Sequence, residues 1–151
     1  MPTPDLPLHG GCLCGKIRFE VTALPMMTMA CHCRDCQKLT SGPCSLSVMV
    51  PIDGFSITQG ETVRGGLKGP RLDHRFCPDC MNWIFTQFAD ASGYLNVRAT
   101  LLDDLSWFRV FVESSTAQKL PWAEIQAVHR YPQFPPAEDR PRLGREFAAW
   151  L

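Results

Sequence analysis

The chain has 151 residues, including eight cysteines, and its fifteen basic residues are balanced by fifteen acidic ones. This length favours one domain with a sizeable buried core, and the zero net charge argues against nucleic acid as a partner. Neither a membrane-spanning run nor an N-terminal signal segment is recognisable, so we expect a cytoplasmic protein with no membrane partner.

Alternating apolar and polar residues predict a series of β-strands. Ile17, Phe19 and Val21 alternate with charged residues, which is the period-two pattern of a strand with one buried face. In chain order, the same pattern predicts strands at residues 46–50, 55–57, 83–88, 94–98 and 107–112. Gly60 and Gly93 mark turns between them. The chain is therefore expected to be mainly β, with short connections.

Helices are predicted at two places. Residues 34–39 follow Cys33 without a helix breaker and predict one helical turn. A short C-terminal helix is predicted after Pro141 by three residues at helical spacing, Leu143, Phe147 and Trp150.

The segment before the C-terminal helix is rich in proline. Residues 131–141 contain four prolines and are expected to form an extended strap. We expect residues 8–130 to form the body of the domain, and residues 131–151 to form a strap and helix that belong to the same domain.

Seven of the eight cysteines fall into three tight clusters. Only Cys44 stands apart from these clusters, which are Cys12-x-Cys14, Cys31-x-Cys33-x-x-Cys36 and Cys77-x-x-Cys80. Where thiols stay reduced, cysteines at such spacings are typical of metal sites rather than disulfides. A tetrahedral zinc ion takes four ligands, so the clusters predict two zinc ions per chain, one of them in an incomplete site.

The two outer pairs predict a structural zinc site. Residues 77–80 read Cys-Pro-Asp-Cys, the form of a zinc knuckle, in which a tight turn presents two thiolates to one ion. Cys12 and Cys14 supply the other two ligands and tie the first strand to the middle of the sheet. Four thiolates leave no position for a substrate, so we expect loss of this ion to unfold the domain.

The middle cluster predicts a reactive zinc site. Cys31, Cys33 and Cys36 supply three thiolates, and three protein ligands with one exchangeable position are typical of catalytic zinc. Cys44 or His32 could instead close the site. However, His32 lies between two ligands in an extended segment and should point the opposite way, while Cys44 precedes a predicted core strand. An open site could hold a thiol beside an aldehyde carbonyl and form or cleave their adduct.

Other residues leave alternatives open. Asp35 could shuttle a proton beside the open zinc, or it could cap the helical turn after Cys33. Basic side chains could contact the carboxylates of a substrate or form a solvated loop; they are Arg64, Lys68, Arg71, His74 and Arg75. His129 is expected on the surface of the strap. Three aromatic residues are expected in the core, Trp107, Trp122 and Trp150.

Three segments taken in order resemble the glutathione-dependent formaldehyde-activating family, which also includes centromere protein V. They are residues 10–19 (GGCLCGKIRF), 31–38 (CHCRDCQK) and 76–80 (FCPDC). The similarity covers about residues 8–125, because Ser41-Gly42, residues 111–114 and residues 120–122 also match the family.

The resemblance implies a single zinc-clamped, complex β-sheet domain with a short C-terminal helix. It implies a structural zinc on Cys12, Cys14, Cys77 and Cys80, and a catalytic zinc on Cys31, Cys33 and Cys36. It also implies a carbon–sulfur lyase activity of the S-(hydroxymethyl)glutathione synthase type, with glutathione or a similar thiol and an aldehyde as substrates. The competing interpretation is a non-catalytic binding module with two structural zincs.

The chain departs from the family pattern directly after the knuckle. The family usually has a glycine there, which accommodates a left-handed backbone, whereas this chain has Met81. A methionine at this position is expected either to be strained or to force a different turn.

Overall fold

The computed structural model describes residues 3–66, 69–90 and 92–151, which form two β-sheets and two α-helices. The smaller sheet is antiparallel and has the strand order β1 (Leu8–Gly11), β2 (Arg18–Val21) and β5 (Phe55–Gln59). The mainly β class expected from the sequence is confirmed.

The larger sheet has eight strands whose spatial order differs from their order in the chain. From edge to edge it runs β11 (Ala127–Arg130), β10 (Val110–Ser114), β3 (Met27–Cys31), β4 (Ser45–Pro51), β9 (Tyr94–Arg98), β8 (Trp83–Phe88), β7 (Leu72–Phe76) and β6 (Val63–Arg64). Strand β10 is parallel to both of its neighbours, and the other pairs are antiparallel. The chain therefore reaches β10 only after it has built the middle of the sheet.

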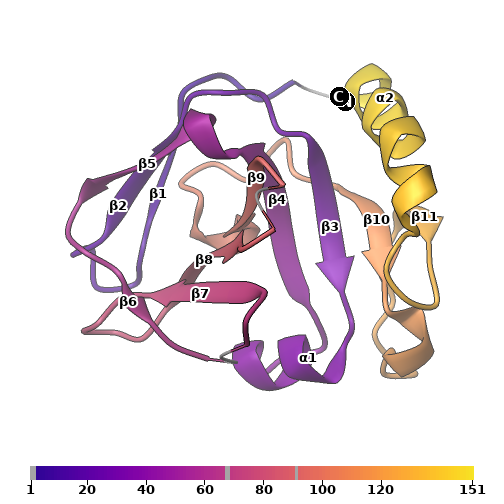
Figure 1. The fold of residues 1–151 in the computed structure, drawn as a ribbon, viewed down its shortest axis with the longest axis horizontal. Coiled ribbons are helices and arrows are strands. Elements are labelled where there is room, and N and C mark those ends of the chain that lie inside the picture. The colour runs from indigo at the N-terminus through magenta and orange to yellow at the C-terminus, as the bar shows by residue number, and fades with distance from the viewer. Residues whose placement is uncertain (1–2, 67–68, 91) are drawn as a thin grey trace.

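Two helices lie against this sheet. Helix α1 (Arg34–Thr40) connects β3 to β4 and lies at their shared end (Figure 1). Helix α2 (Arg140–Trp150) lies beside β3 and β10 and buries Leu143 and Phe147 against them. No helix in the described ranges is long and apolar enough to cross a bilayer.

The hydrophobic core has two parts. The larger part joins the two sheets, with Phe19 and Val21 of β2 in one cluster with Val48 and Val97 of the large sheet. The smaller part joins the large sheet to α2 through Met27, Met29, Phe111, Val112, Leu143 and Phe147. Because side chains alternate along a strand, the large sheet turns one face to each part.

The structure confirms most of the strands predicted by alternation and moves one of them. Strands β2, β4, β5, β8 and β9 lie where the sequence predicts them. The strand predicted at residues 107–112 instead begins at Val110, because Trp107 and Phe108 lie in a turn closed by a 3.0 Å hydrogen bond from Phe108 N to Leu105 O.

Five strands were not predicted: β1, β3, β6, β7 and β11. All five residues of β3 are buried, so the strand has no alternation to reveal it. Strand β6 has only two residues, too few for any pattern.

The extended strap is shorter than expected. Residues 137–139 form a 3₁₀ helix and α2 already begins at Arg140, so the prediction that residues 131–141 are extended throughout is wrong at its end. Pro141 lies in the first turn of α2, where a missing backbone N–H breaks no intrahelical bond. That residues 131–151 belong to the same domain as residues 8–130 stays a prediction.

The aromatic and histidine predictions are only partly confirmed. Trp107 is 2% exposed, and the ring of Trp150 lies 5.2 Å from that of Phe111, as expected for core residues. Trp122 is 70% exposed, so its assignment to the core is wrong. His129 belongs to β11 rather than to the strap, and its ring packs edge-on against Phe111 at 4.9 Å.

Candidate metal centres

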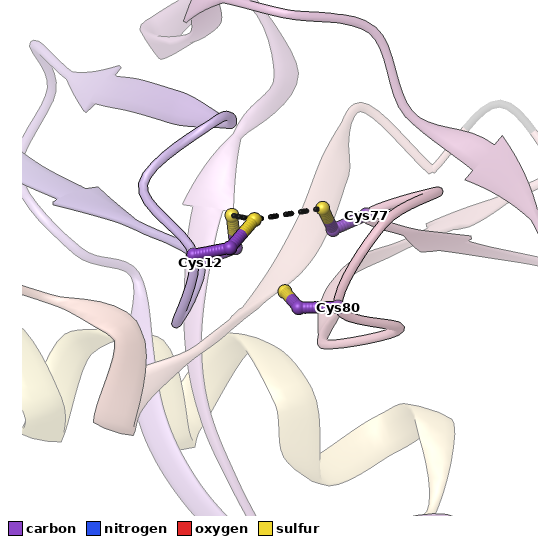
Figure 2. A group of neighbouring side chains, drawn as sticks. Cys12, Cys77 and Cys80 are labelled. Atoms are coloured by element: carbon purple, nitrogen blue, oxygen red, sulfur yellow. Dashed lines mark hydrogen bonds between the residues drawn. The ribbon is translucent and has the colours of Figure 1, made fainter.

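The four outer cysteines gather where two turns meet. Cys12 and Cys14 lie in the turn between β1 and β2, while Cys77 and Cys80 lie in the turn between β7 and β8 (Figure 2). The four Sγ atoms all lie within 4.8 Å of one another. These turns belong to different sheets, so a shared ion would join the two sheets.

The sulfur spacing in this group fits a zinc ion. The Cys12 and Cys14 sulfurs are 3.5 Å apart, and those of Cys14 and Cys77 are 3.7 Å apart. Around a tetrahedral ion with Zn–S bonds of about 2.3 Å, neighbouring sulfurs lie about 3.8 Å apart. The backbone N–H of Ile17 donates to the Cys12 sulfur at 3.3 Å, and that of Leu13 donates to Asn82 Oδ1 at 2.7 Å, which ties one turn to the other.

Ionisation of this group calls for a cation. Burial raises the pKa of Cys12, but the Ile17 N–H and the neighbouring thiols lower it, to about 6 overall. For Cys14, the Lys16 N–H lowers the pKa, but burial and the same thiols raise it to about 12. Four thiolates this close together repel one another, so a divalent cation would stabilise the fully ionised group.

Met81 has the left-handed backbone that the sequence comparison anticipates. Its φ is +59° and its side chain is 58% exposed. Its N–H still donates to Cys77 O at 3.0 Å, which closes the knuckle turn. The turn is thus retained without glycine, and Met81 adopts the left-handed backbone instead of forcing a different turn, as the first of the two expected outcomes requires.

The middle cysteines gather at the junction of β3 and α1. Cys31 is the last residue of β3, Cys33 is the N-cap of α1, and Cys36 lies in its first turn. Their Sγ atoms lie within 4.8 Å of one another, and the Cys36 N–H donates to the Cys33 sulfur at 3.4 Å. The thiols of Cys33 and Cys36 lower the pKa of Cys31 to about 2, while the pKa of Cys36 is raised by its neighbours.

Neither candidate for a fourth ligand joins this trio. Among the described residues, no other Cys, His, Asp or Glu belongs to the group. His32 is completely buried and does not belong to the sulfur group, and its Nε2 lies 2.9 Å from Glu113 Oε1. Cys44 remains apart, and burial raises the pKa of its thiol. If the three thiols held a tetrahedral ion, they would leave one of its positions to a further ligand.

A buried ionic network that the sequence did not reveal supports the segment between the ligands. Glu113 is completely buried and accepts hydrogen bonds from His32, from Lys119 Nζ at 2.6 Å and from Arg130 Nε at 3.0 Å. Burial raises the pKa of Glu113, but Lys119 and His32 lower it, and the net pKa lies below the ordinary value. A glutamate directly after three apolar residues, Val110, Phe111 and Val112, was the available signal.

Arg98 is a second buried charge that the sequence did not assign. It is 7% exposed and its guanidinium lies 4.0 Å above the ring centroid of Trp83. Its Nη2 donates to Asn96 O at 3.2 Å, and its Nε has no hydrogen-bond partner in the described part of the chain. Burial lowers the pKa of Arg98, negative charge on Cys36 and Cys31 raises it, and the net value is about 10. The trio thus has a cation close by to balance its charge.

Asp35 and the predicted basic residues lie on several different elements. Asp35 is exposed in the first turn of α1, and Cys33 itself caps the helix, so the second of the two alternatives for Asp35, capping, is wrong. His74 lies in β7 and is 5% exposed, with its Nδ1 2.7 Å from Thr86 Oγ1, which excludes it from a solvated loop. Arg64 pairs with Asp73. Lys68 lies outside the described residues.

Comparison with known proteins agrees with this arrangement. A family model described as "Glutathione-dependent formaldehyde-activating enzyme" matches residues 7–118, which include both cysteine groups. No curated protein matches the chain. A crystal structure of a Rhodobacter sphaeroides protein is similar in fold, with a TM-score of 0.53 and 18% identity over 63% of this chain and 87% of that chain. Since the family model matches well over half of the residues, the chain belongs to the glutathione-dependent formaldehyde-activating enzyme family.

Proposed function

We propose that this protein is a zinc-dependent carbon–sulfur lyase of the S-(hydroxymethyl)glutathione synthase type. It would join a small thiol, such as glutathione, to an aldehyde, such as formaldehyde, or cleave the adduct. The observation that carries the proposal is the trio of Cys31, Cys33 and Cys36, which gathers three sulfurs without a fourth ligand among the described residues. Because its thiols must stay reduced, we place the protein in the cytoplasm.

Each cysteine group has its own role in this proposal. Cys31, Cys33 and Cys36 would hold the catalytic zinc, which supplies, when bound, an exchangeable position where a thiol loses its proton. The second group, Cys12, Cys14, Cys77 and Cys80, would hold a structural zinc with no free position.

The chain's own residues would position the reactants and balance their charge. The buried Arg98 guanidinium offsets the negative charge of the trio, and the Cys36 N–H fixes the Cys33 sulfur. As the new S–C bond forms, the π electron pair of the carbonyl moves to its oxygen, and that oxygen takes up one proton for the one that the thiol released. Asp35, exposed on the first turn of α1, is our candidate for carrying this proton.

The test is exchange NMR on glutathione and formaldehyde with zinc-loaded protein, together with Cys33→Ser and Cys44→Ser. We expect the native protein to accelerate adduct exchange, and Cys33→Ser to abolish the acceleration and lose one of two zinc equivalents. Serine is itself a good N-cap, so helix α1 should survive this change.

Cys44→Ser is the matched control, because Cys44 lies outside the trio. It should keep both zinc equivalents and the full exchange rate. If protein with two zinc equivalents leaves the exchange rate unchanged for every thiol and aldehyde offered, the proposed function is wrong.

A further inference from the structure

A large cavity lies between the big sheet and the C-terminal segment. Its volume is about 670 Å³, within the range typical of small-molecule sites. Four of the chain's six methionines line it, Met26, Met27, Met29 and Met49, together with the aromatic rings of Phe88 and Tyr94. Methionine side chains are flexible and polarisable, so such a lining adapts to apolar ligands of differing shape.

This cavity lies on the face of the sheet to which alternation assigns Cys31, one of the three thiols. Side chains two residues apart share a face, so Met27 and Met29 of β3 share one with Cys31. The step from Met29 to Cys31 is about 7 Å at the usual rise of a strand. Met29, which lines the cavity, is paired with Ser47, and Ser47 is paired with Arg98. Side chains of this row therefore lie next to the row that pairs Cys31 with Ser45 on the same face.

Helix α2 forms one wall of the cavity and is indented there. Gly144 and Leu143 both line it, and α2 lies alongside β3 in Figure 1. A Cβ added at Gly144 would meet no atom within 4 Å. Glycine in a helix interior is destabilising relative to alanine. Gly144 therefore lowers the stability of α2, while the absence of a side chain leaves the cavity open.

Two basic side chains line the cavity. Arg71 and Arg140 line it, and both are exposed. Neither forms a salt bridge with any residue that the structure describes. Asp90 is the acidic side chain in the lining, and it accepts a hydrogen bond from Ser92 N at 3.1 Å. The lining therefore combines an apolar body with a net positive charge.

We propose that this cavity binds the apolar body of the aldehyde substrate, and that this substrate is a medium-chain aldehyde with a carboxylate at its far end. Arg71 and Arg140 hold the carboxylate, the methionines contact the chain, and the aldehyde carbon reaches the three thiols. The addition step is the one given above, with an alkyl chain in place of a hydrogen of formaldehyde. The link to the thiols rests on the proposed function, whereas ligand binding in the cavity does not.

The test is NMR of protein carrying ¹³C-methyl methionine, titrated with decanoate as an unreactive probe. We expect the methyl signals of Met26, Met27, Met29 and Met49 to shift, and that of Met81 in the knuckle to stay, since Met81 does not line the cavity. Decanol, which has the chain without the carboxylate, should bind on the order of tenfold more weakly. Glutathione should leave the four signals unchanged.

Two pairs of variants on α2 separate specific from unspecific binding. Gly144→Leu fills the cavity with a good helix former and should abolish the shifts, whereas Ala148→Leu, at an exposed position of the same helix, should not. Arg140→Gln should weaken decanoate binding by roughly tenfold and leave decanol binding unchanged. Arg145→Gln removes an exposed charge that does not line the cavity and should change neither.

Failure of this inference is distinguishable from failure of the proposed function. If decanoate shifts none of the four methyl signals, or if Gly144→Leu binds it as well as the native protein, the cavity inference is wrong even when formaldehyde exchange is accelerated. If decanoate binds as described while no aldehyde undergoes faster thiol exchange, the cavity stands as a ligand site and the proposed function is wrong.

Discussion

Two single residues, Met81 and Glu113, are expected to affect the stability of this fold in opposite directions. Met81 occupies a left-handed conformation that L-residues avoid, next to a candidate zinc ligand. Glu113 is completely buried and bonds three cationic or imidazole partners. The backbone of Met81 is therefore expected to be strained. The buried negative charge of Glu113 is balanced only while its partners are present.

Replacing Met81 by glycine should stabilise the protein by about 1 kcal/mol, because glycine adopts positive φ without the Cβ clash. The measurement is urea unfolding at saturating zinc. Leu13→Gly is the matched control, since Leu13 is also an exposed apolar residue in a cysteine-bearing turn but does not have a positive φ. That change should destabilise the protein, and the same sign for both variants would contradict the assignment of strain.

Replacing Glu113 by alanine should destabilise the protein by roughly 3 kcal/mol, because it leaves the buried His32 ring without its partner and separates Lys119 and Arg130 from their shared carboxylate. Urea unfolding measures this loss. Glu124→Ala, at an exposed position, should stay within about 0.5 kcal/mol of the native protein. Similar losses for the two variants would mean that the network contributes nothing.

The contribution of Glu113 should also depend on pH. Its pKa is lowered in the folded protein, so the stability it provides is present above the ordinary pKa of glutamate and is lost as the pH falls through the lowered value. The difference in unfolding free energy between native protein and Glu113→Gln should therefore shrink on acidification. Acid also protonates the cysteines, but it does so in both proteins, and the comparison removes that effect. A difference that grows toward low pH would contradict the lowered pKa.

Among the elements, helix α2 is short but firmly packed. Phe147 is completely buried, and its ring lies 5.3 Å from that of Phe111 in β10 and 5.9 Å from that of Trp150. Leu143, one turn earlier, is equally buried. The helix therefore depends on the sheet for its stability, since an isolated helix of this length is marginal in water.

Replacing Phe147 by alanine should destabilise the protein by about 3–5 kcal/mol, the usual loss for a buried phenylalanine. Thermal unfolding followed by far-ultraviolet circular dichroism measures it. Arg145→Ala, at an exposed position of the same helix, should have little effect. If Phe147→Ala melts α2 but leaves the unfolding of the sheet unchanged, residues 131–151 do not belong to the same domain as residues 8–130.

At the scale of the whole molecule, the four outer cysteines connect segments that lie far apart in the chain. Cys14 and Cys77 are separated by 63 positions, and the turns that carry them belong to different sheets. A structural zinc contributes about 10–16 kcal/mol of binding free energy, which is comparable with the whole stability of a typical domain. The connection between the sheets should therefore depend on the metal.

Cys14→Ser should unfold the protein or leave it without cooperative thermal unfolding, and an excess of chelator should do the same to the native chain. Cys36→Ser removes a cysteine from the other group and should lose one zinc equivalent while the two sheets remain folded. The measurements are zinc content and thermal unfolding of each variant. If Cys36→Ser unfolds the chain as fully as Cys14→Ser, the division into a structural and a reactive site is wrong.

Local sequence patterns predicted much of the fold, but they failed where tertiary packing determines which residues are buried. Alternation revealed β2, β4, β5, β8 and β9, although β8 buries its first four residues in succession. It could not reveal β3, whose two faces are both covered. Trp122, which was expected in the core because it is a large aromatic residue, is 70% exposed, since hydrophobicity alone does not say which aromatic residue finds a partner.

The sequence by itself determined the three cysteine clusters, the family motifs and the non-glycine residue after the knuckle, because each is carried by a short run of neighbouring residues. Only the tertiary structure decided that His32 contacts Glu113, that Arg98 lies in the row of the sheet next to that of Cys31, and that the methionine cavity lies on the face of β3 that carries Cys31. These relations join residues on different strands. Strand order and register create them, and both arise from packing across the whole sheet rather than from any local pattern.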